Sequence, residues 1–221
     1  EFPKADSDTL ISVDEVSKAI ERQVTVLSQW EKKMGVDPAR FGDDRTSIII
    51  RQMEKIVRKE VFSGLDTMQI TGHILRLAKD EFVKPENIFI DEIGLGAGIV
   101  DRCREQKWNV TGVNVAEKAI DYEHYLNLRA ELYGDKVKEW IKKADLPDDD
   151  DYYELSNIKY KFTSQGQMQI ESKEDMKKRG LPSPDVADSI MLTFATGGYV
   201  GYAIKPSSPV LPYYGDRDVQ F

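Results

Sequence analysis

Four aspartates in this sequence stand where local structure could bring their carboxylates together. Asp37 closes the stretch KKMGVD and Asp91 closes NIFID, and each stretch is typical of a short strand. Asp185 and Asp188 lie three residues apart in SPDVADS, so both face one side of a predicted helix. Because neighbouring parallel strands end at one edge of a sheet, where open α/β sheets bind ligands, we expect three or four carboxylates at that edge.

Carboxylates that point at one place repel each other strongly unless cations lie among them. Hard oxygen ligands in such numbers suit Mg²⁺ or Mn²⁺. Two such ions, about 3.5–4 Å apart, would stabilise both the attacking and the leaving oxygen of a phosphodiester displacement. Each fragment alone also fits an ordinary turn, cap or helix start, so the prediction depends on the combination.

The sequence gives little support for catalysis by cysteine or histidine residues. Zinc sites and nucleophilic triads need clustered ligands, but Cys103 is the single cysteine, and His73 and His124 lie inside predicted helices without a partner motif. The acidic run at 148–151 is expected to be a solvated loop without a ligand role. The net charge of −8 argues against a large basic nucleic-acid surface but leaves room for a local basic patch.

The glycines at 94, 96 and 98 follow a predicted strand and precede a predicted helix, which is also how a dinucleotide site begins. Asp101 stands where the third glycine of that motif is needed, and no acidic residue for a ribose follows about 20 residues on. A nucleotide-binding module is therefore an alternative that saturable NAD binding would revive. The glycines otherwise let the chain turn tightly into the helix beside Asp91.

Apolar periodicity predicts the elements that must position these residues. Helices are expected within 8–30 with Ser12 as N-cap, over 66–82 with Asp66 as N-cap, from the glycines at 94–98 to 106, over 118–144 with a break near Gly134, over 173–180, and over 181–196 with Ser183 as N-cap and Pro184 in its first turn. Strands are expected over 32–37, 46–52, 55–63, 87–91 and 109–115, with a second hairpin over 157–172.

The order of these elements predicts an α/β fold. Early strands joined by hairpins pair antiparallel, and later strands separated by helices pair parallel, so we expect a mixed sheet flanked by helices on both faces, with an extra β-hairpin. The chain of 221 residues, 40% hydrophobic and 32% charged, has the composition of a soluble globular protein. No apolar run approaches the roughly 18 residues that span a membrane.

Taken together, GVDPARFGDDRTSIII, IFIDEIGLGAGIVDRCREQ, VTGVN, YLNLRAELY and ESKEDMKKRGLPSPDVADSIMLTFA resemble the C-terminal nuclease domain of the large terminase subunit of tailed bacteriophages. The resemblance covers roughly residues 33–196. It implies a ribonuclease H-like fold with a five-stranded sheet, and a divalent-metal endonuclease that cuts concatemeric viral double-stranded DNA during genome packaging. A related Holliday-junction resolvase or integrase-like nuclease is the alternative, and a purely structural packaging component is another.

The resemblance assigns residues to roles. Asp37, Asp91 and Asp185 match the family's catalytic acidic positions, Asp188 is a further candidate metal ligand, and Asp43 matches a position where some members carry an additional acidic residue. The metal would be Mg²⁺ or Mn²⁺, with two ions expected. The basic residues that we regard as candidates for contact with the DNA backbone are Arg40, Arg45, Lys173, Lys177, Lys178 and Arg179.

The resemblance also implies a division of the chain and a set of partners. Residues 1–30 would link an ATPase motor to a nuclease domain at 31–196, followed by an extended tail at 197–221. The phosphate loop G-x-x-x-x-G-K-[ST] is missing from this sequence, so we expect no ATP hydrolysis by this chain. In a full-length protein the partners would be the motor, the portal and the small terminase subunit, in the host cytoplasm. The isolated domain is expected to be monomeric.

Overall fold

A five-stranded mixed sheet forms the centre of the structure, a computed structural model in which residues 8–39 and 44–196 are described. Its strands are β1 (Lys32–Asp37), β2 (Thr46–Gln52), β3 (Lys55–Phe62), β4 (Ile88–Asp91) and β5 (Thr111–Val113). The order is β3-β2-β1-β4-β5, antiparallel from β3 to β1 and parallel from β1 to β5. This confirms the predicted mixed sheet. Two candidate residues, Arg40 and Asp43, and the tail at 197–221 lie outside the described residues.

The strands form because their apolar side chains alternate between two cores. Ile48 and Ile50 of β2 pack into the cluster on one face of the sheet, and Ile49 packs into the cluster on the other. Every residue of β2 is buried, as expected for a strand covered on both faces. Met53, with φ of 54°, makes the tight turn from β2 into β3.

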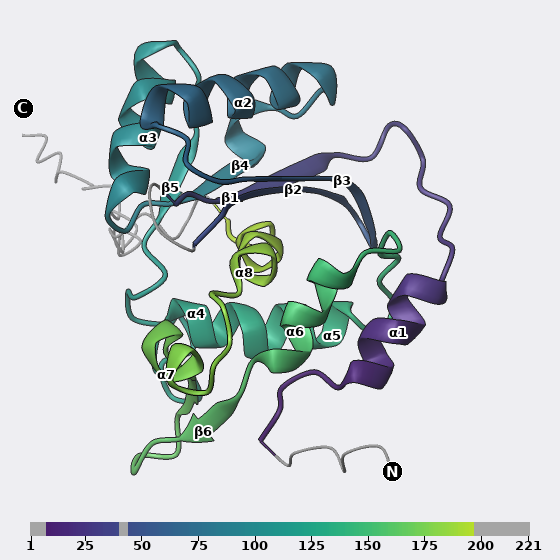
Figure 1. The fold of residues 1–221 in the computed structure, drawn as a ribbon, viewed down its shortest axis with the longest axis vertical. Coiled ribbons are helices and arrows are strands. Elements are labelled where there is room, and N and C mark those ends of the chain that lie inside the picture. The colour runs from purple at the N-terminus through teal and green to yellow at the C-terminus, as the bar shows by residue number, and fades with distance from the viewer. Residues whose placement is uncertain (1–7, 40–43, 197–221) are drawn as a thin grey trace, which may run out of the picture.

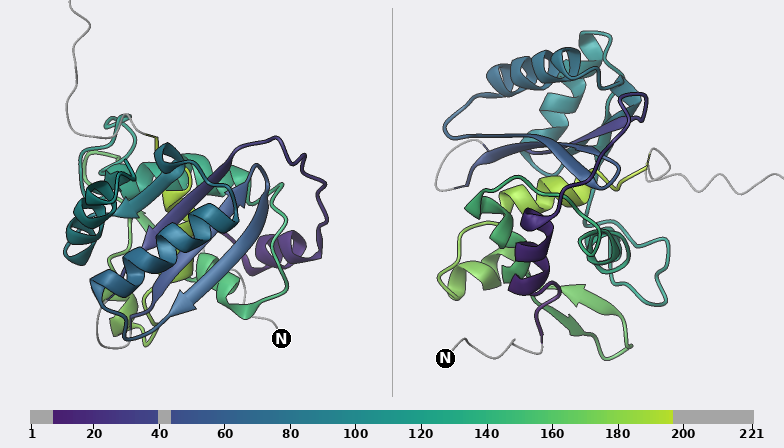
Figure 2. Two further views of the ribbon diagram at one scale, coloured as in Figure 1. Left: turned by 90° about the horizontal axis from the view of Figure 1, so that it is seen from above. Right: turned by 90° about the vertical axis from the view of Figure 1, so that its right-hand side faces the viewer.

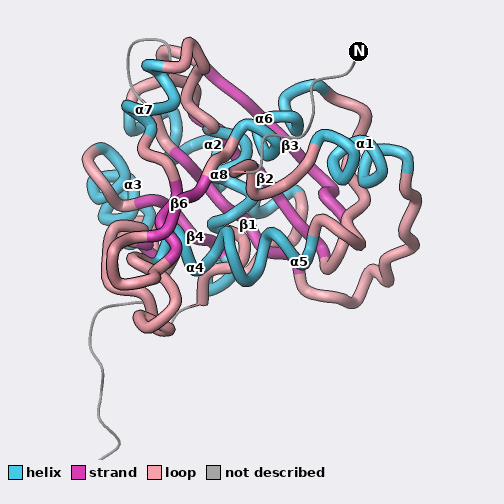
Figure 3. Tube along the Cα trace, turned by 90° about the horizontal axis from the view of Figure 1, so that it is seen from below, coloured by secondary structure: helices cyan, strands magenta, loops and turns pink. Residues whose placement is uncertain are grey.

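Helices cover both faces of this sheet, as predicted. In Figure 1, α2 (Thr67–Asp80) and α3 (Leu95–Glu105) lie above the sheet, and α8 (Asp185–Leu192) lies directly below it. The side view in Figure 2 shows the layers in this order, with α1 (Val13–Glu21) and the remaining helices below α8. Figure 3 shows this lower layer from beneath. No described helix has the length and apolarity that crossing a membrane requires.

Predicted caps hold the start of two helices. Ser12 accepts a hydrogen bond from Glu15 N while the Glu15 side chain accepts one from Ser12 N, and Asp66 forms the same reciprocal box with Gln69. Helix α1 buries Val16 in the same cluster as α8, so residues 13–21 are part of the domain's core. The boundary at residue 30 stays a prediction.

The long helix predicted over 118–144 begins ten residues late. Residues 118–127 form turns instead, because Leu126 N donates to Met168 O and Met168 N donates to His124 O, which ties this segment to the second hairpin. Asn127 then caps a helix that runs through α4 (Leu128–Glu131), a π-helix (Leu132–Val137) and α5 (Lys138–Trp140). The predicted break near Gly134 is this π-helical segment.

The remaining elements are short. They are a 3₁₀ turn (Pro85–Asn87), a second 3₁₀ turn (Asp150–Tyr153), α6 (Glu154–Asn157), the hairpin of β6 (Tyr160–Phe162) and β7 (Met168–Ile170), and α7 (Lys173–Lys178). The predicted hairpin is confirmed and forms a separate two-stranded sheet. The expected cap of the last helix is wrong: α8 starts at Asp185, so Pro184 rather than Ser183 is the N-cap.

Gly35 lets α8 pack directly on β1. A Cβ at this position would lie 2.0 Å from Ser189 O, a backbone atom that cannot give way. Gly35→Ala is therefore expected to lower the free energy of unfolding by about 3 kcal/mol, because α8 must shift from the sheet. Urea unfolding measures this. Gly72→Ala is the control: it lies in α2 with nothing within 4 Å of its Cβ and should stabilise the protein slightly.

Candidate metal-binding site

Two neighbouring parallel strands deliver Asp37 and Asp91 to one edge of the sheet. Val36 of β1 pairs with Ile90 of β4, so the aspartates that end the two strands are neighbours in register. Asp37 is 6% exposed and Asp91 is half-buried. The sequence-based expectation that these two strand ends lie side by side is confirmed.

Helix α8 brings a third carboxylate to this edge. Ser189 anchors the helix, since its hydroxyl accepts a hydrogen bond from Asp37 N (3.1 Å) and donates one to Ser47 O (2.9 Å). Its neighbour Asp188, 3% exposed, then faces the same place as Asp37. Lys173, at the start of α7, lies between these two carboxylates: its Nζ is 2.9 Å from Asp37 Oδ2 and 3.1 Å from Asp188 Oδ2.

The positive charge near Asp37 does not compensate for the burial of its carboxylate. Burial raises the pKa of Asp37 to about 8, against the lowering effect of Lys173, and the nearby carboxylates of Asp188 and Asp91 raise it further. Burial likewise raises the pKa of Asp91 to about 6, although Asp91 Oδ1 accepts a hydrogen bond from Ile93 N (3.0 Å). Burial favours the neutral form of these acidic groups, and a bound cation would instead stabilise their ionised form.

Asp188 differs from its neighbours because basic groups surround it. Burial alone would raise the pKa of Asp188, but Arg129 and Lys173 outweigh it and hold the pKa below its ordinary value. Arg129 and Tyr133 both bond to Asp188 Oδ1. Neither residue was predicted from the sequence, where the signal was an arginine between the apolar Leu128 and Ala130 of a helix.

Asp185 lies on the same helix, close enough to Lys173 for that lysine to lower its pKa, but its hydrogen bond goes to another residue. Its Oδ2 accepts a hydrogen bond from Arg45 N (2.8 Å), and burial raises its pKa. Asp188 rather than Asp185 therefore shares Lys173 with Asp37. The roles predicted for these carboxylates stay predictions. As the side chains lie, no group of three acidic, histidine or cysteine residues within 8–39 and 44–196 could hold a metal ion.

The candidate DNA-contact residues that the structure describes, all but Arg40, are engaged with protein groups. Arg45 pairs with Asp151 (3.0 Å) and Glu154 (2.7 Å), and Lys173 lies within the carboxylate cluster. The three basic residues at 177–179 pair with acidic side chains: Lys177 with Asp44, Lys178 with Asp175, and Arg179 with Glu171. Exposed pairs of this kind contribute little, so a phosphate could replace the carboxylate. DNA contact by these residues stays a prediction.

A buried acidic residue behind the cluster holds the start of α8. Glu154 Oε2 accepts hydrogen bonds from Val186 N (2.7 Å) and Ala187 N (3.1 Å), while Oε1 pairs with Arg45. Burial raises the pKa of Glu154 to about 7. The preceding acidic run is not wholly solvated as expected, because Asp151 pairs with Arg45 and Lys59.

Glu154→Ala should destabilise the protein by about 3 kcal/mol, because two buried backbone N–H groups lose their acceptor and the Arg45 guanidinium loses one of its two carboxylate partners. The free energy of unfolding in urea is the measurement. Asp150→Ala, in the exposed part of the same acidic run, should change it by no more than about 0.5 kcal/mol. Equal losses in the two variants would contradict the structural role given to Glu154.

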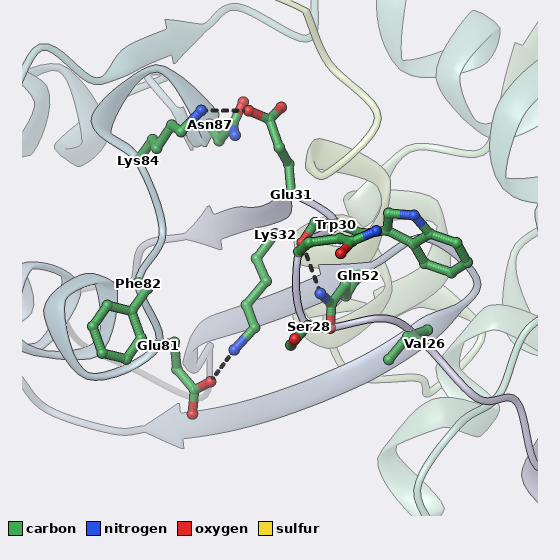
Figure 4. A pocket seen from close by; sticks show the side chains of 11 residues that line it. Val26, Ser28, Trp30, Glu31, Lys32, Gln52, Glu81, Phe82, Lys84 and Asn87 are labelled. Carbon is green, nitrogen blue, oxygen red and sulfur yellow. Dashed lines mark hydrogen bonds and ion pairs between the residues drawn. The ribbon is translucent and has the colours of Figure 1, made fainter.

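A pocket of about 590 Å³ lies elsewhere, where β1 and β4 begin (Figure 4). Trp30, Phe82 and two ion pairs, Lys32 with Glu81 and Lys84 with Glu31, line it. Its charges are matched within the pocket. The carboxylates of Asp37 and Asp91, at the opposite ends of these strands, are not among its lining residues.

Comparison with known proteins places this arrangement in context. No family model matches the sequence. The chain is 28% identical over 209 residues to a probable terminase large subunit of Enterobacteria phage P7. That alignment covers 86% of this chain and 42% of the relative, so the chain spans less than half the length of this curated relative.

Solved nuclease domains share the fold. A variant of the nuclease domain of the large terminase subunit gp2 of bacterial virus Sf6, with manganese, superposes with a TM-score of 0.70 at 17% identity, over 83% of this chain and 97% of that one. The large terminase nuclease from thermophilic phage G20c with bound magnesium gives 0.63 at 17% identity, over 85% and 97%. The predicted fold class and the resemblance to terminase nuclease domains are confirmed.

Proposed function

We propose that this chain is a divalent-metal-dependent endonuclease that cuts concatemeric viral double-stranded DNA during genome packaging. The observation that carries this proposal is the cluster of Asp37, Asp91 and Asp188 at the carboxyl ends of β1 and β4. The similarity to terminase nuclease domains supports the choice of DNA as substrate.

The chemistry of these three donors fits Mg²⁺ or Mn²⁺, although among the described residues the side chains, with Lys173 between Asp37 and Asp188, do not lie as a metal-holding group. All three groups are carboxylates, the hard oxygen ligands that these ions prefer. Burial raises the pKa of Asp37 to about 8, so its ionised form lacks a sufficient counter-charge in the cluster. Asp37, Asp91 and Asp188 would hold the metal, with Asp185 and Asp43 as further candidates. When bound, two ions would supply the Lewis acidity that activates water and neutralises charge on the leaving 3′ oxygen.

The chain's own groups have separate tasks in this proposal. Asp37 and Asp91 provide rigid carboxylates, because each ends a strand of the central sheet. Lys173 bridges Asp37 and Asp188 and so offsets their mutual repulsion before metal enters. Exchange of this ammonium contact for metal contacts would free Lys173 to face a phosphate.

The length of the phage P7 relative supports a proposal about further domains and partners. The alignment leaves more than half of the phage P7 protein outside the matched region. We infer that a full-length protein carries an ATPase motor and works with the portal and the small terminase subunit in the host cytoplasm. The chain by itself would act as a monomer with weak affinity for DNA, since its net charge is −8.

Cleavage of supercoiled plasmid tests the proposal. The chain should nick and linearise plasmid with Mn²⁺ or Mg²⁺, and EDTA should stop the reaction. Asp91→Asn should remove cleavage and keep the circular dichroism spectrum of the parent. If Asp91→Asn cuts as fast as the parent chain, the assigned site is not the nuclease site; a strong preference for four-way junctions over duplex would indicate a resolvase instead.

A further inference from the structure

Two side chains from one helical segment bond to the same oxygen of Asp188. Arg129 donates to Asp188 Oδ1 from Nε (3.2 Å) and Nη2 (3.0 Å), and Tyr133 donates to it from its hydroxyl (2.8 Å). The Arg129 side chain is 12% exposed and Tyr133 is fully buried. Oδ1 is therefore occupied by three donated hydrogen bonds, and Oδ2 is the oxygen that meets Lys173 and the carboxylate cluster.

The third nitrogen of Arg129 reaches the other side of the site. Nη1 donates to Glu171 O (2.8 Å), two residues before Lys173. A guanidinium is planar, so the directions of its nitrogens are fixed relative to one another, and the bonds to Asp188 and Glu171 O orient the whole group. One side chain thereby links the orientation of the Asp188 carboxylate to the backbone of the segment that carries Lys173.

Tyr133 reaches Asp188 from a π-helical turn, Leu132–Val137. A π-helix widens the turn relative to an α-helix and is common at functional sites. Next to it, Gly134 allows close packing: a Cβ there would lie 2.7 Å from a ring carbon of Tyr125 and 2.8 Å from Met168 Sδ. The turn that presents Tyr133 is thus held in place by the segment paired with the hairpin.

We propose that Arg129 and Tyr133 are positioning residues, which hold Asp188 by Oδ1 so that Oδ2 is directed at a divalent metal ion. This inference rests on the proposed function, because it takes Asp188 to be a metal ligand. Partners that bond to a metal ligand set its orientation, and their loss typically weakens metal binding about 10–100-fold. A buried ion pair that served stability alone would affect folding without this effect on metal binding.

Metal binding and folding are measured separately to distinguish these roles. Binding of Mn²⁺ to the 221-residue chain is followed by the loss of the electron paramagnetic resonance signal of free Mn²⁺, without DNA. Thermal unfolding in EDTA reports the stability of each variant. The first test variant is Arg129→Lys, which keeps the positive charge but loses the planar set of guanidinium N–H donors. The second is Tyr133→Phe, which loses the hydroxyl and keeps the ring.

The chain offers a matched control for each variant. Arg51 is a buried arginine whose guanidinium bonds to Thr193 and Met53 O, away from the cluster, so Arg51→Lys costs a similar set of hydrogen bonds. Tyr152 is a fully buried tyrosine whose hydroxyl has no hydrogen-bond partner among the described residues, which makes Tyr152→Phe the control for Tyr133→Phe.

Arg129→Lys should weaken Mn²⁺ binding about 10–100-fold and Tyr133→Phe about tenfold. Arg51→Lys should lower the unfolding temperature and leave Mn²⁺ affinity at the parent value, and Tyr152→Phe should leave both unchanged. If Arg129→Lys is too unstable to study, Tyr133→Phe alone decides.

Parent-like Mn²⁺ affinity in a folded Tyr133→Phe variant would overturn the positioning role while leaving the proposed function intact, provided that Asp188→Asn loses binding. If the parent chain binds no Mn²⁺, or Asp188→Asn binds as the parent does, the assigned metal site itself fails and the positioning role fails with it.

Discussion

Asp188→Asn is expected to slow plasmid cleavage about a thousandfold, which corresponds to about 4 kcal/mol of lost transition-state stabilisation. Asp188 shares Lys173 with Asp37 at the carboxyl edge of the sheet and is the one member of the cluster whose basic neighbours hold its pKa below the ordinary value. The amide keeps the size of the side chain but removes the charge that a metal ion requires. Initial rates with Mn²⁺ in excess measure the effect.

Asp185→Asn is the matched comparison, three residues away on the same helix. Asp185 accepts a hydrogen bond from Arg45 N, which an amide oxygen can also accept, so we expect a loss of about tenfold or less. A thousandfold loss for Asp185→Asn with near-parent cleavage by Asp188→Asn would reverse the assignment and restore the role that sequence resemblance gave to Asp185.

Without metal, the chain is expected to be more stable at pH 5 than at pH 8. Burial raises the pKa of Asp37 to about 8, of Glu154 to about 7 and of Asp91 to about 6, so the folded state binds protons that the unfolded state has already released. Stability from such groups is fully present below their unfolded pKa values and is lost as the pH rises through the folded ones. Each group contributes up to about 1.4 kcal/mol per pH unit to this slope.

Asp37→Asn should flatten that slope because the amide does not titrate, whereas Asp150→Asn, an exposed carboxylate, should leave it as in the parent. Mn²⁺ should raise the unfolding temperature of the parent chain more at pH 8 than at pH 5, since the metal binds ionised carboxylates and stabilises the state that it binds. Thermal unfolding in EDTA and in Mn²⁺ across this range provides the data. An unchanged slope in Asp37→Asn would contradict the charge deficit assigned to Asp37.

Local sequence patterns predicted most of the fold because they reflect local physics. The period of apolar residues identified the strands at 32–37 and 46–52 with the observed boundaries, and short side chains at Ser12 and Asp66 marked helix starts. The failure at 118–127 has a long-range cause. Hydrogen bonds to Met168, more than 40 residues away, hold that segment in turns against its helical periodicity.

The proximity of Asp37 and Asp91 could be predicted from the sequence by itself, because the last residues of two neighbouring parallel strands must lie at the same edge of the sheet. Which of Asp185 and Asp188 pairs with Lys173 could not be predicted, because residues three apart share a helix face and the pairing depends on how α8 packs on the sheet at Gly35. Tertiary structure also determined which groups bond to the Asp188 carboxylate. Lys173, Arg129 and Tyr133 reach it from segments 15 to 59 residues away in the sequence. Periodicity records which side of an element is buried, whereas the pairing of buried charges depends on contacts that form only when distant segments pack together.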